Sequence, residues 1–215
     1  MRLMKVGAYM SFMINGQNVF VIVLVTFLTS LLLIPIIKKV SIHVNAMDYP
    51  NSPRKIHKKP MPRLGGVAIF LSFMLGYMLF AKSITMMLSI LMGSFLLILV
   101  GFIDSINPVK ARYQLITHII AAATVVIYGG LVLNDVSFLG INLTFSYPFN
   151  YIVTIIFIVA FINMLNLIDG LDGLAAGISS IYFLTIAIIA LILNQMGGLD
   201  VTLAFIMLGS TLGFL

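Results

Sequence analysis

Two carboxylates stand three residues apart at the end of a long apolar run. Asp169 and Asp172 are separated by Gly170 and Leu171 and are followed by Gly173. Residues three apart share one face of a helix, and the glycines allow a backbone or a ligand to approach closely. Asp-Gly pairs also form ordinary turns, so the spacing alone leaves a simple turn open.

Amides and a further acid lie at comparable positions. Asn163 and Asn166 precede the pair at the end of the same apolar run, where each amide requires a hydrogen-bond partner. Asp104 ends another apolar run. Carboxylate and amide oxygens without a thiol suit Mg²⁺ or Mn²⁺. The alternative is that each Asp is simply a water-exposed residue at the end of a helix, and we adopt this interpretation for Asp135 and Asp200.

A basic segment lies between two of the apolar runs. Residues 53–66 contain three prolines, six basic side chains counting His57, and Gly65-Gly66, whose amides could face an anion at the start of a helix. The alternative is a cytoplasmic loop that only touches anionic lipid. Together with the acids and a divalent cation, this segment favours phosphoryl transfer to a membrane-bound substrate.

The composition places these residues in a membrane. Of the 215 residues 61% are apolar and only 8% are charged, against roughly 45–50% and 25% in soluble domains. The net charge of +6 points to lipid headgroups and anionic substrates rather than to nucleic acid. The absence of Cys excludes disulfides, Cys-based zinc sites and a thiol nucleophile.

Seven apolar runs are long enough to be considered as membrane helices. The sequence predicts an all-α polytopic membrane protein with six or seven transmembrane helices in one bundle, forming a single transmembrane domain over residues 1–215. The first run is expected to be retained rather than removed as a signal peptide. The runs are residues 19–37, 64–81, 83–103, 113–133, 149–168, 173–193 and 201–215.

The distribution of Lys and Arg predicts the orientation. Seven of the twelve lie in loop 38–63, and strict alternation places 104–112 and 169–172 on the same side, which then holds nine. The other side keeps three, so loop 38–63 is expected to be cytoplasmic and the N-terminus extracytoplasmic.

Residues 135–147 alternate apolar and polar side chains. Ile141, Leu143 and Phe145 are separated by single polar residues, and Gly140 precedes them. This period of two predicts a small extracytoplasmic β-hairpin, with an irregular loop as the alternative.

Three blocks of the sequence resemble the polyprenyl-phosphate N-acetylhexosamine-1-phosphate transferases, the glycosyltransferase 4 type, and most closely those of teichoic acid synthesis. The blocks are Arg54–Gly66, Gly101–Asp104 and Asn163–Gly177, of which the last is long and specific. The resemblance runs from about Ile34 to the end of the chain.

The resemblance implies a bacterial cell-membrane enzyme of cell-wall biogenesis with its active face in the cytoplasm. It would transfer a sugar 1-phosphate, expected to be N-acetylglucosamine 1-phosphate, from a UDP-sugar to undecaprenyl phosphate and release UMP. The implied cofactor is Mg²⁺, or Mn²⁺ in its place. The implied catalytic residues are Asp104, Asp169 and Asp172, the second and third also as metal ligands, and the implied substrate-binding residues are His57, Lys58, Lys59, Arg63, Asn163 and Asn166.

The sequence departs from the family pattern in two places. The family usually has Asp-Asp where this chain has Asp104-Ser105, and it continues into an acidic block and a His-rich loop beyond the segment that ends at Leu215. We therefore expect a C-terminally truncated member, for which a homo-oligomer is compatible with the polar faces left unpaired. The alternatives are a catalytically inactive membrane partner and, ranked last, a transporter. His118 is expected to pair with a polar neighbour and is given no catalytic role.

Overall fold

The computed structural model describes residues 13–14, 16–50, 60–81, 85–138, 140–169, 173–193 and 199–215. The chain divides into two compact units, and each is described by itself. Unit 1 comprises residues 1–82 and 170–215, and unit 2 comprises residues 83–169. The prediction of one transmembrane domain over 1–215 is not tested by this division.

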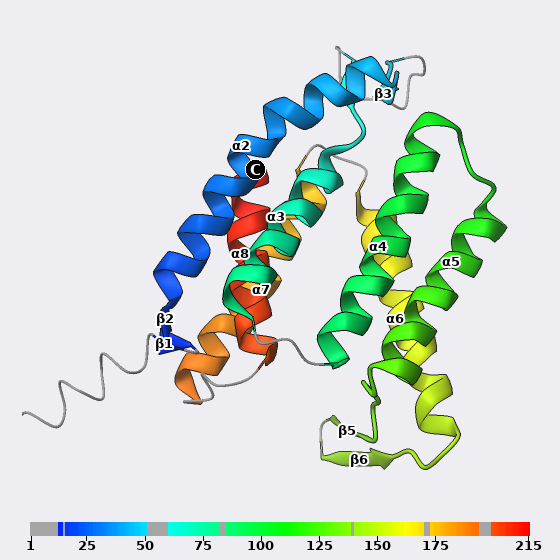
Figure 1. The fold of residues 1–215 in the computed structure, drawn as a ribbon. Coiled ribbons are helices and arrows are strands. Elements are labelled where there is room, and N and C mark those ends of the chain that lie inside the picture. Colours follow the sequence, from blue (N-terminus) through cyan, green and yellow to red (C-terminus); the bar gives the residue numbers. More distant parts are fainter. Residues whose placement is uncertain are drawn as a thin grey trace, which may run out of the picture. The chain divides into compact units, whose positions relative to one another are not determined.

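Unit 1 is built around its last helix. Helix α8 (Leu199–Phe214) packs against α2 (Val19–His43), α3 (Gly65–Phe80) and α7 (Leu174–Ile192), so the end of the chain lies beside α2 (Figure 1). The largest of these contacts is the one between α2 and α8.

Small residues let α8 approach α2 closely. A Cβ atom at Gly209 would collide with the hydroxyl of Thr26 and the carbonyl of Val23. Close helix approach through small residues is typical of membrane helix pairs, where lipid provides no hydrophobic driving force for association. The sequence therefore holds glycine at this contact for a steric reason.

Hydroxyl groups join all four helices of this core. Ser72 Oγ on α3 donates to the carbonyl of Thr26 on α2 at 2.7 Å, and Ser210 Oγ on α8 lies 3.0 Å from Ser72 Oγ. Ser180 Oγ on α7 lies 2.8 Å from Thr211 Oγ1 on α8. All five residues are buried, so these hydroxyl groups are satisfied by protein groups rather than by water.

Helix α2 is longer than the apolar run that predicted it. It passes through Pro35 and Lys38 and ends at His43, giving 25 residues and a length of about 37 Å. The expectation that the helix ends near residue 37 is thus wrong. The last turns exceed the hydrocarbon thickness of about 30 Å, so lysines there can reach the headgroup region.

A two-residue ladder joins the two ends of the basic loop. Strand β3 (Met47–Asp48) pairs antiparallel with β4 (Met61–Pro62), and the amide of Arg63 donates to the carbonyl of Ala46 at 3.0 Å. Asn45 precedes the ladder in the left-handed region with φ of 57°. A second ladder joins β1 (Met13–Ile14) to β2 (Gln17–Asn18) ahead of α2.

Unit 2 is a layer of three helices. Helix α4 (Thr85–Ile106) and α6 (Phe149–Ile168) both contact α5 (Ala111–Ala123) and its continuation η1 (Thr124–Tyr128), a π-helical turn (Figure 1). The turn between α4 and α5 spans only residues 107–110. It therefore brings the end of α4 next to the start of α5.

The predicted hairpin is present in unit 2. Strand β5 (Asp135–Phe138) pairs antiparallel with β6 (Ile141–Thr144), and Gly140 adopts φ of 82°, a conformation that L side chains rarely adopt. The side-chain Nδ2 of Asn150 on α6 donates to Oδ1 of Asn134, the residue before β5, at 3.0 Å. This hydrogen bond ties the hairpin to α6.

The all-α membrane fold is confirmed. Seven α-helices occur in the described ranges, and their bounds follow the seven apolar runs, apart from the longer α2 and an earlier end at Tyr128 for the fourth run. Helices α2, α4, α5 with η1, and α6 are long and apolar enough to cross a membrane, and α3, α7 and α8 are shorter apolar helices.

Candidate functional site

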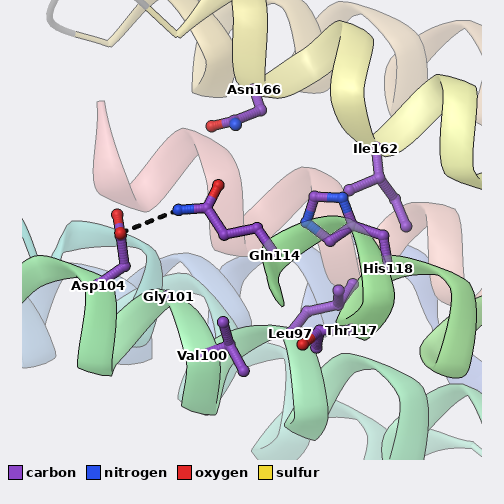
Figure 2. A pocket seen from close by; sticks show the side chains of 9 residues that line it. All are labelled: Leu97, Val100, Gly101, Asp104, Gln114, Thr117, His118, Ile162 and Asn166. Atoms are coloured by element: carbon purple, nitrogen blue, oxygen red, sulfur yellow. Dashed lines mark hydrogen bonds between the residues drawn. The ribbon is translucent and has the colours of Figure 1, made fainter. Parts of the chain in front are cut away.

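A cavity of about 300 Å³ lies among the three helices of unit 2. Its walls combine apolar and polar side chains, and Figure 2 shows them converging from α4, α5 and α6. The lining residues are Leu97, Val100, Gly101, Asp104, Gln114, Thr117, His118, Ile162 and Asn166. Two predicted site residues, Asp104 and Asn166, thus line one cavity although 62 positions separate them in the sequence.

The carboxylate of Asp104 is held by two donors. Its Oδ1 accepts from the amide N–H of Val109 at 2.8 Å and from Nε2 of Gln114 at 2.9 Å. Gln114 Nε2 also lies 3.4 Å from the carbonyl oxygen of Val109. Because Val109 belongs to the turn and Gln114 to α5, Asp104 joins the end of one helix to the start of the next.

The imidazole of His118 lies one helical turn beyond Gln114 and close to the side chain of Asn163. Its Nδ1 is buried without a hydrogen-bond partner. Pairing with a polar neighbour was expected for His118. Asn163 donates to the carbonyl of Val159 at 2.7 Å within α6. It is not among the residues that line the cavity.

The signature residues at the end of α6 occupy different positions relative to the cavity. Asn166 lines the cavity and is exposed, as is Asp169, which caps α6 with its amide donating to the carbonyl of Leu165 at 3.1 Å. Asp172 lies outside the described residues. The pairing of Asp169 with Asp172 therefore stays a prediction.

Ser105 stands where the family usually has a second aspartate. Its hydroxyl donates to the carbonyl of Gly101 at 2.7 Å, one turn back in α4. This bond satisfies the hydroxyl within its own helix, as is common for serine in a helix.

The predicted anion-binding residues belong mostly to the segment 51–59. His57, Lys58 and Lys59 lie outside the described residues. Arg63 is described and exposed directly before α3. It belongs to unit 1, so its approach to the cavity of unit 2 stays a prediction.

The cavity itself has an acidic wall. Asp104 is the one Asp, Glu, Lys or Arg side chain among its described lining residues, and the remaining polar groups are two amides, a hydroxyl and an imidazole. Lys110 and Arg112 are exposed at the start of α5, and the Arg112 guanidinium lies 4.9 Å from the ring centroid of Tyr113. An anion at this cavity would depend on cationic groups that come from elsewhere.

Oxygen ligands suit the predicted metal, although no full ligand set is visible. Within the described ranges no group of three or more His, Cys, Asp or Glu side chains is placed to hold a metal ion. Asp104, Asp169 and the amides supply the carboxylate and carbonyl oxygens that Mg²⁺ prefers, while Asp172 falls outside those ranges.

Two site residues were not found from the sequence. Gln114 and Thr117 line the cavity but belong to no block that was assigned a role. One signal was present: a four-residue turn containing Pro108 joins two apolar helices, which brings Gln114 back beside Asp104 in a helical hairpin.

Comparisons with known proteins agree with the resemblance. The family model described as glycosyl transferase family 4 matches residues 87–215, which include most of α4, all of α5 to α8 and the residues that line the cavity. The chain is 37% identical over 196 residues to the probable undecaprenyl-phosphate N-acetylglucosaminyl 1-phosphate transferase of Bacillus subtilis (strain 168). That match covers 89% of this chain and 53% of the relative, so the chain spans about half the length of the relative.

Proposed function

This chain belongs to glycosyl transferase family 4, and we propose that it serves the transfer of N-acetylglucosamine 1-phosphate from its UDP-sugar to undecaprenyl phosphate. The name of the Bacillus subtilis relative supports this sugar and this acceptor. The observation that carries the proposal is the cavity of unit 2, in which Asp104 of one block and Asn166 of another line the same polar hollow.

The proposed reaction exchanges one phosphoanhydride bond for another. An oxygen of the lipid phosphate attacks the β-phosphorus of the UDP-sugar and forms a new P–O bond. The bond from the β-phosphorus to the oxygen bridging the two phosphates breaks, and UMP leaves with the electron pair. The second pKa of a phosphate monoester is about 6, so the acceptor is already largely ionised at neutral pH and needs little help from a general base.

The protein's task is therefore to hold two anionic groups in line. Asp104, anchored by Val109 and Gln114, gives the cavity one fixed carboxylate. Asn163 and Asn166 would orient the bound groups through their amides.

Basic side chains of the loop would neutralise phosphate charge. The residues proposed for this are His57, Lys58, Lys59 and Arg63. Mg²⁺, if held by Asp169 and Asp172, would neutralise further charge on the diphosphate. The site would face the cytoplasm, where UDP-sugars are made, and the product would enter envelope glycopolymers such as teichoic acid.

The test compares the chain with an extended form. The extended chain consists of residues 1–215 followed by the part of the Bacillus subtilis relative beyond the aligned region. Both are purified in detergent and supplied with UDP-N-acetylglucosamine, undecaprenyl phosphate and Mg²⁺, and UMP release is followed. We expect the extended chain to turn over and the 215-residue chain to insert into membranes without turnover, because charged walls of the site would be missing.

A second candidate is a catalytically inactive membrane partner, which Ser105 favours because the family usually has a second aspartate at this position. The two candidates predict different results for the extended chain. An extended chain that folds and inserts but releases no UMP would support the inactive partner and contradict the proposed transferase. Steady turnover by residues 1–215 alone, abolished by Asp169→Asn, would show that half of the relative's length suffices.

A further inference from the structure

We propose that Gln114 is a positioning residue for transfer, acting through Asp104. The inference rests on the proposed function and adds to it a side chain on α5 that none of the three resembling blocks contains. Gln114 is half-buried and lines the cavity. Its role follows from two contacts and the orientation of one amide group.

The first contact fixes the carboxylate. Nε2 of Gln114 donates to Oδ1 of Asp104 at 2.9 Å, a charge-assisted hydrogen bond of the stronger kind. Oδ1 is also the acceptor of the Val109 amide at 2.8 Å. Two donors on one oxygen determine the rotation of the carboxylate about its own axis, and with it the direction in which the group faces the cavity.

The second contact ties the amide to the turn. Nε2 carries two protons, and besides Asp104 it has the Val109 carbonyl within 3.4 Å. This second contact restricts the rotamers of Gln114, so its side chain cannot move together with Asp104 if the carboxylate rotates. It transmits the geometry of the turn at residues 107–110 to the carboxylate.

The third feature concerns the remaining oxygen of the amide. With Nε2 committed to Asp104, the carbonyl oxygen of Gln114 points to the side of the cavity where Asn166 lies (Figure 2). Gln114 thus fixes the carboxylate of α4 through one end of its amide and presents the other end to the cavity.

A purely structural role must be distinguished from positioning. Gln114 could stabilise the hairpin of α4 and α5 without any effect on chemistry. Positioning predicts an effect on kcat with little effect on KM, and it predicts that the effect disappears once Asp104 is gone. A structural role predicts reduced stability and losses that do not depend on Asp104.

The first measurement needs no activity and uses the 215-residue chain. All six acidic residues of the sequence are Asp, so labelling with Asp carrying ¹³C at the side-chain carboxyl gives one signal for each. The Asp104 signal is the one missing from Asp104→Ala. We expect Gln114→Leu to move this signal and to leave the Asp135 signal in place, and we expect the matched control Gln17→Leu, at an exposed position in β2, to move neither.

The second measurement uses the extended chain. We expect Gln114→Leu to lower kcat by about 10- to 100-fold with KM changed by less than about twofold, the scale of a slightly misplaced group. In the Asp104→Ala background the same substitution should change kcat by less than about twofold. Gln114→Glu, which keeps the length but places a carboxylate against Asp104, should lower kcat at least as far.

Each outcome decides the matter. An unmoved Asp104 signal in folded Gln114→Leu and Gln114→Glu, judged by circular dichroism and gel filtration, would overturn the proposal. Equal losses of kcat with and without Asp104, or a change in KM alone, would overturn it as well. If the parent extended chain shows no turnover, the proposed function is wrong. The proposal that Gln114 positions Asp104 for transfer is then wrong as well, even if the carboxyl signal moves.

Discussion

Asp104 combines two tasks in one side chain. Its Oδ1 closes the turn between α4 and α5 by accepting from Val109 and Gln114, and the same group lines the cavity. Asp169, by contrast, is an exposed residue that caps α6 through its backbone. Because Asp104 has both tasks, its loss should affect folding as well as chemistry.

The first prediction concerns the carboxylate of Asp169, which the resemblance implies as a metal ligand. In the extended chain we expect Asp169→Asn to lower the rate of UMP release by about 10²–10³, the scale for removing one charged contact to a transition state. The substitution keeps the shape of the side chain and removes its charge. The matched control is Asp135→Asn in strand β5, which should stay within about twofold of the parent. Near-parental turnover by Asp169→Asn, with Mg²⁺ as the sole metal, would refute the assignment of Asp169.

For single residues, the sequence predicted which side chains belong to the site better than it predicted their contacts. It predicted Asp104 and Asp169 at helix ends on one membrane face, because alternation of apolar runs determines which helix ends lie on the same side. It could not assign Gln114 to Asp104, since that contact depends on the length and path of the turn at 107–110. For the same reason it paired His118 with a polar neighbour without identifying Asn163.

Among the elements, α8 shows how glycine sets the packing of unit 1. A Cβ at Gly209 would meet the Thr26 hydroxyl and the Val23 carbonyl, and one at Gly213 would meet the Phe27 carbonyl. Backbone atoms on α2 cannot move aside as a flexible side chain can. Space for a methyl group is therefore available only if α8 moves away from α2.

The second prediction tests this contact with two identical changes. Gly209→Ala should lower the stability of the purified chain by about 1–3 kcal/mol, the usual cost of overpacking. Gly177→Ala on α7, where a Cβ would meet nothing within 4 Å, should be neutral or slightly stabilising because alanine favours the helix. Thermal unfolding in detergent, followed by circular dichroism, measures both. Equal melting temperatures for the two variants would show that α8 does not pack on α2 through Gly209.

The elements themselves were largely predictable. Apolar runs between charges gave the helices, because a bilayer requires long uncharged segments whose backbone is satisfied internally. The hairpin at 135–147 was predicted from its period of two. Helix α2 overran its run because the helical backbone continues through Pro35 and the following lysines, which the headgroup region tolerates. The ladder of β3 and β4 was not predicted, because strands of two residues are too short to show a periodic pattern in the sequence.

For the whole molecule, the question is which end of each helix faces the cytoplasm. The family and the apolar helices establish a multi-pass membrane protein, and the nine-to-three division of Lys and Arg predicts its orientation. Within unit 2, the turn at 107–110 and the hairpin at 135–144 lie at opposite ends of α5 with η1. They must therefore face opposite sides of the membrane if this helix spans it.

The third prediction uses that opposition. Because the chain has no Cys, Asn107→Cys and Asn142→Cys each introduce a single thiol by the same change, and both positions are exposed. A membrane-impermeant maleimide added to intact cells should label position 142 and not position 107, and permeabilised cells should show both labelled. The reason is electrostatic, since Lys110 and Arg112 flank position 107 and are retained on the cytoplasmic side. Labelling of position 107 alone from outside would show the opposite orientation. Asp104, which lies at the same end of α4 as position 107, would then face away from cytoplasmic UDP-sugars, and the proposed reaction would lose its physical basis.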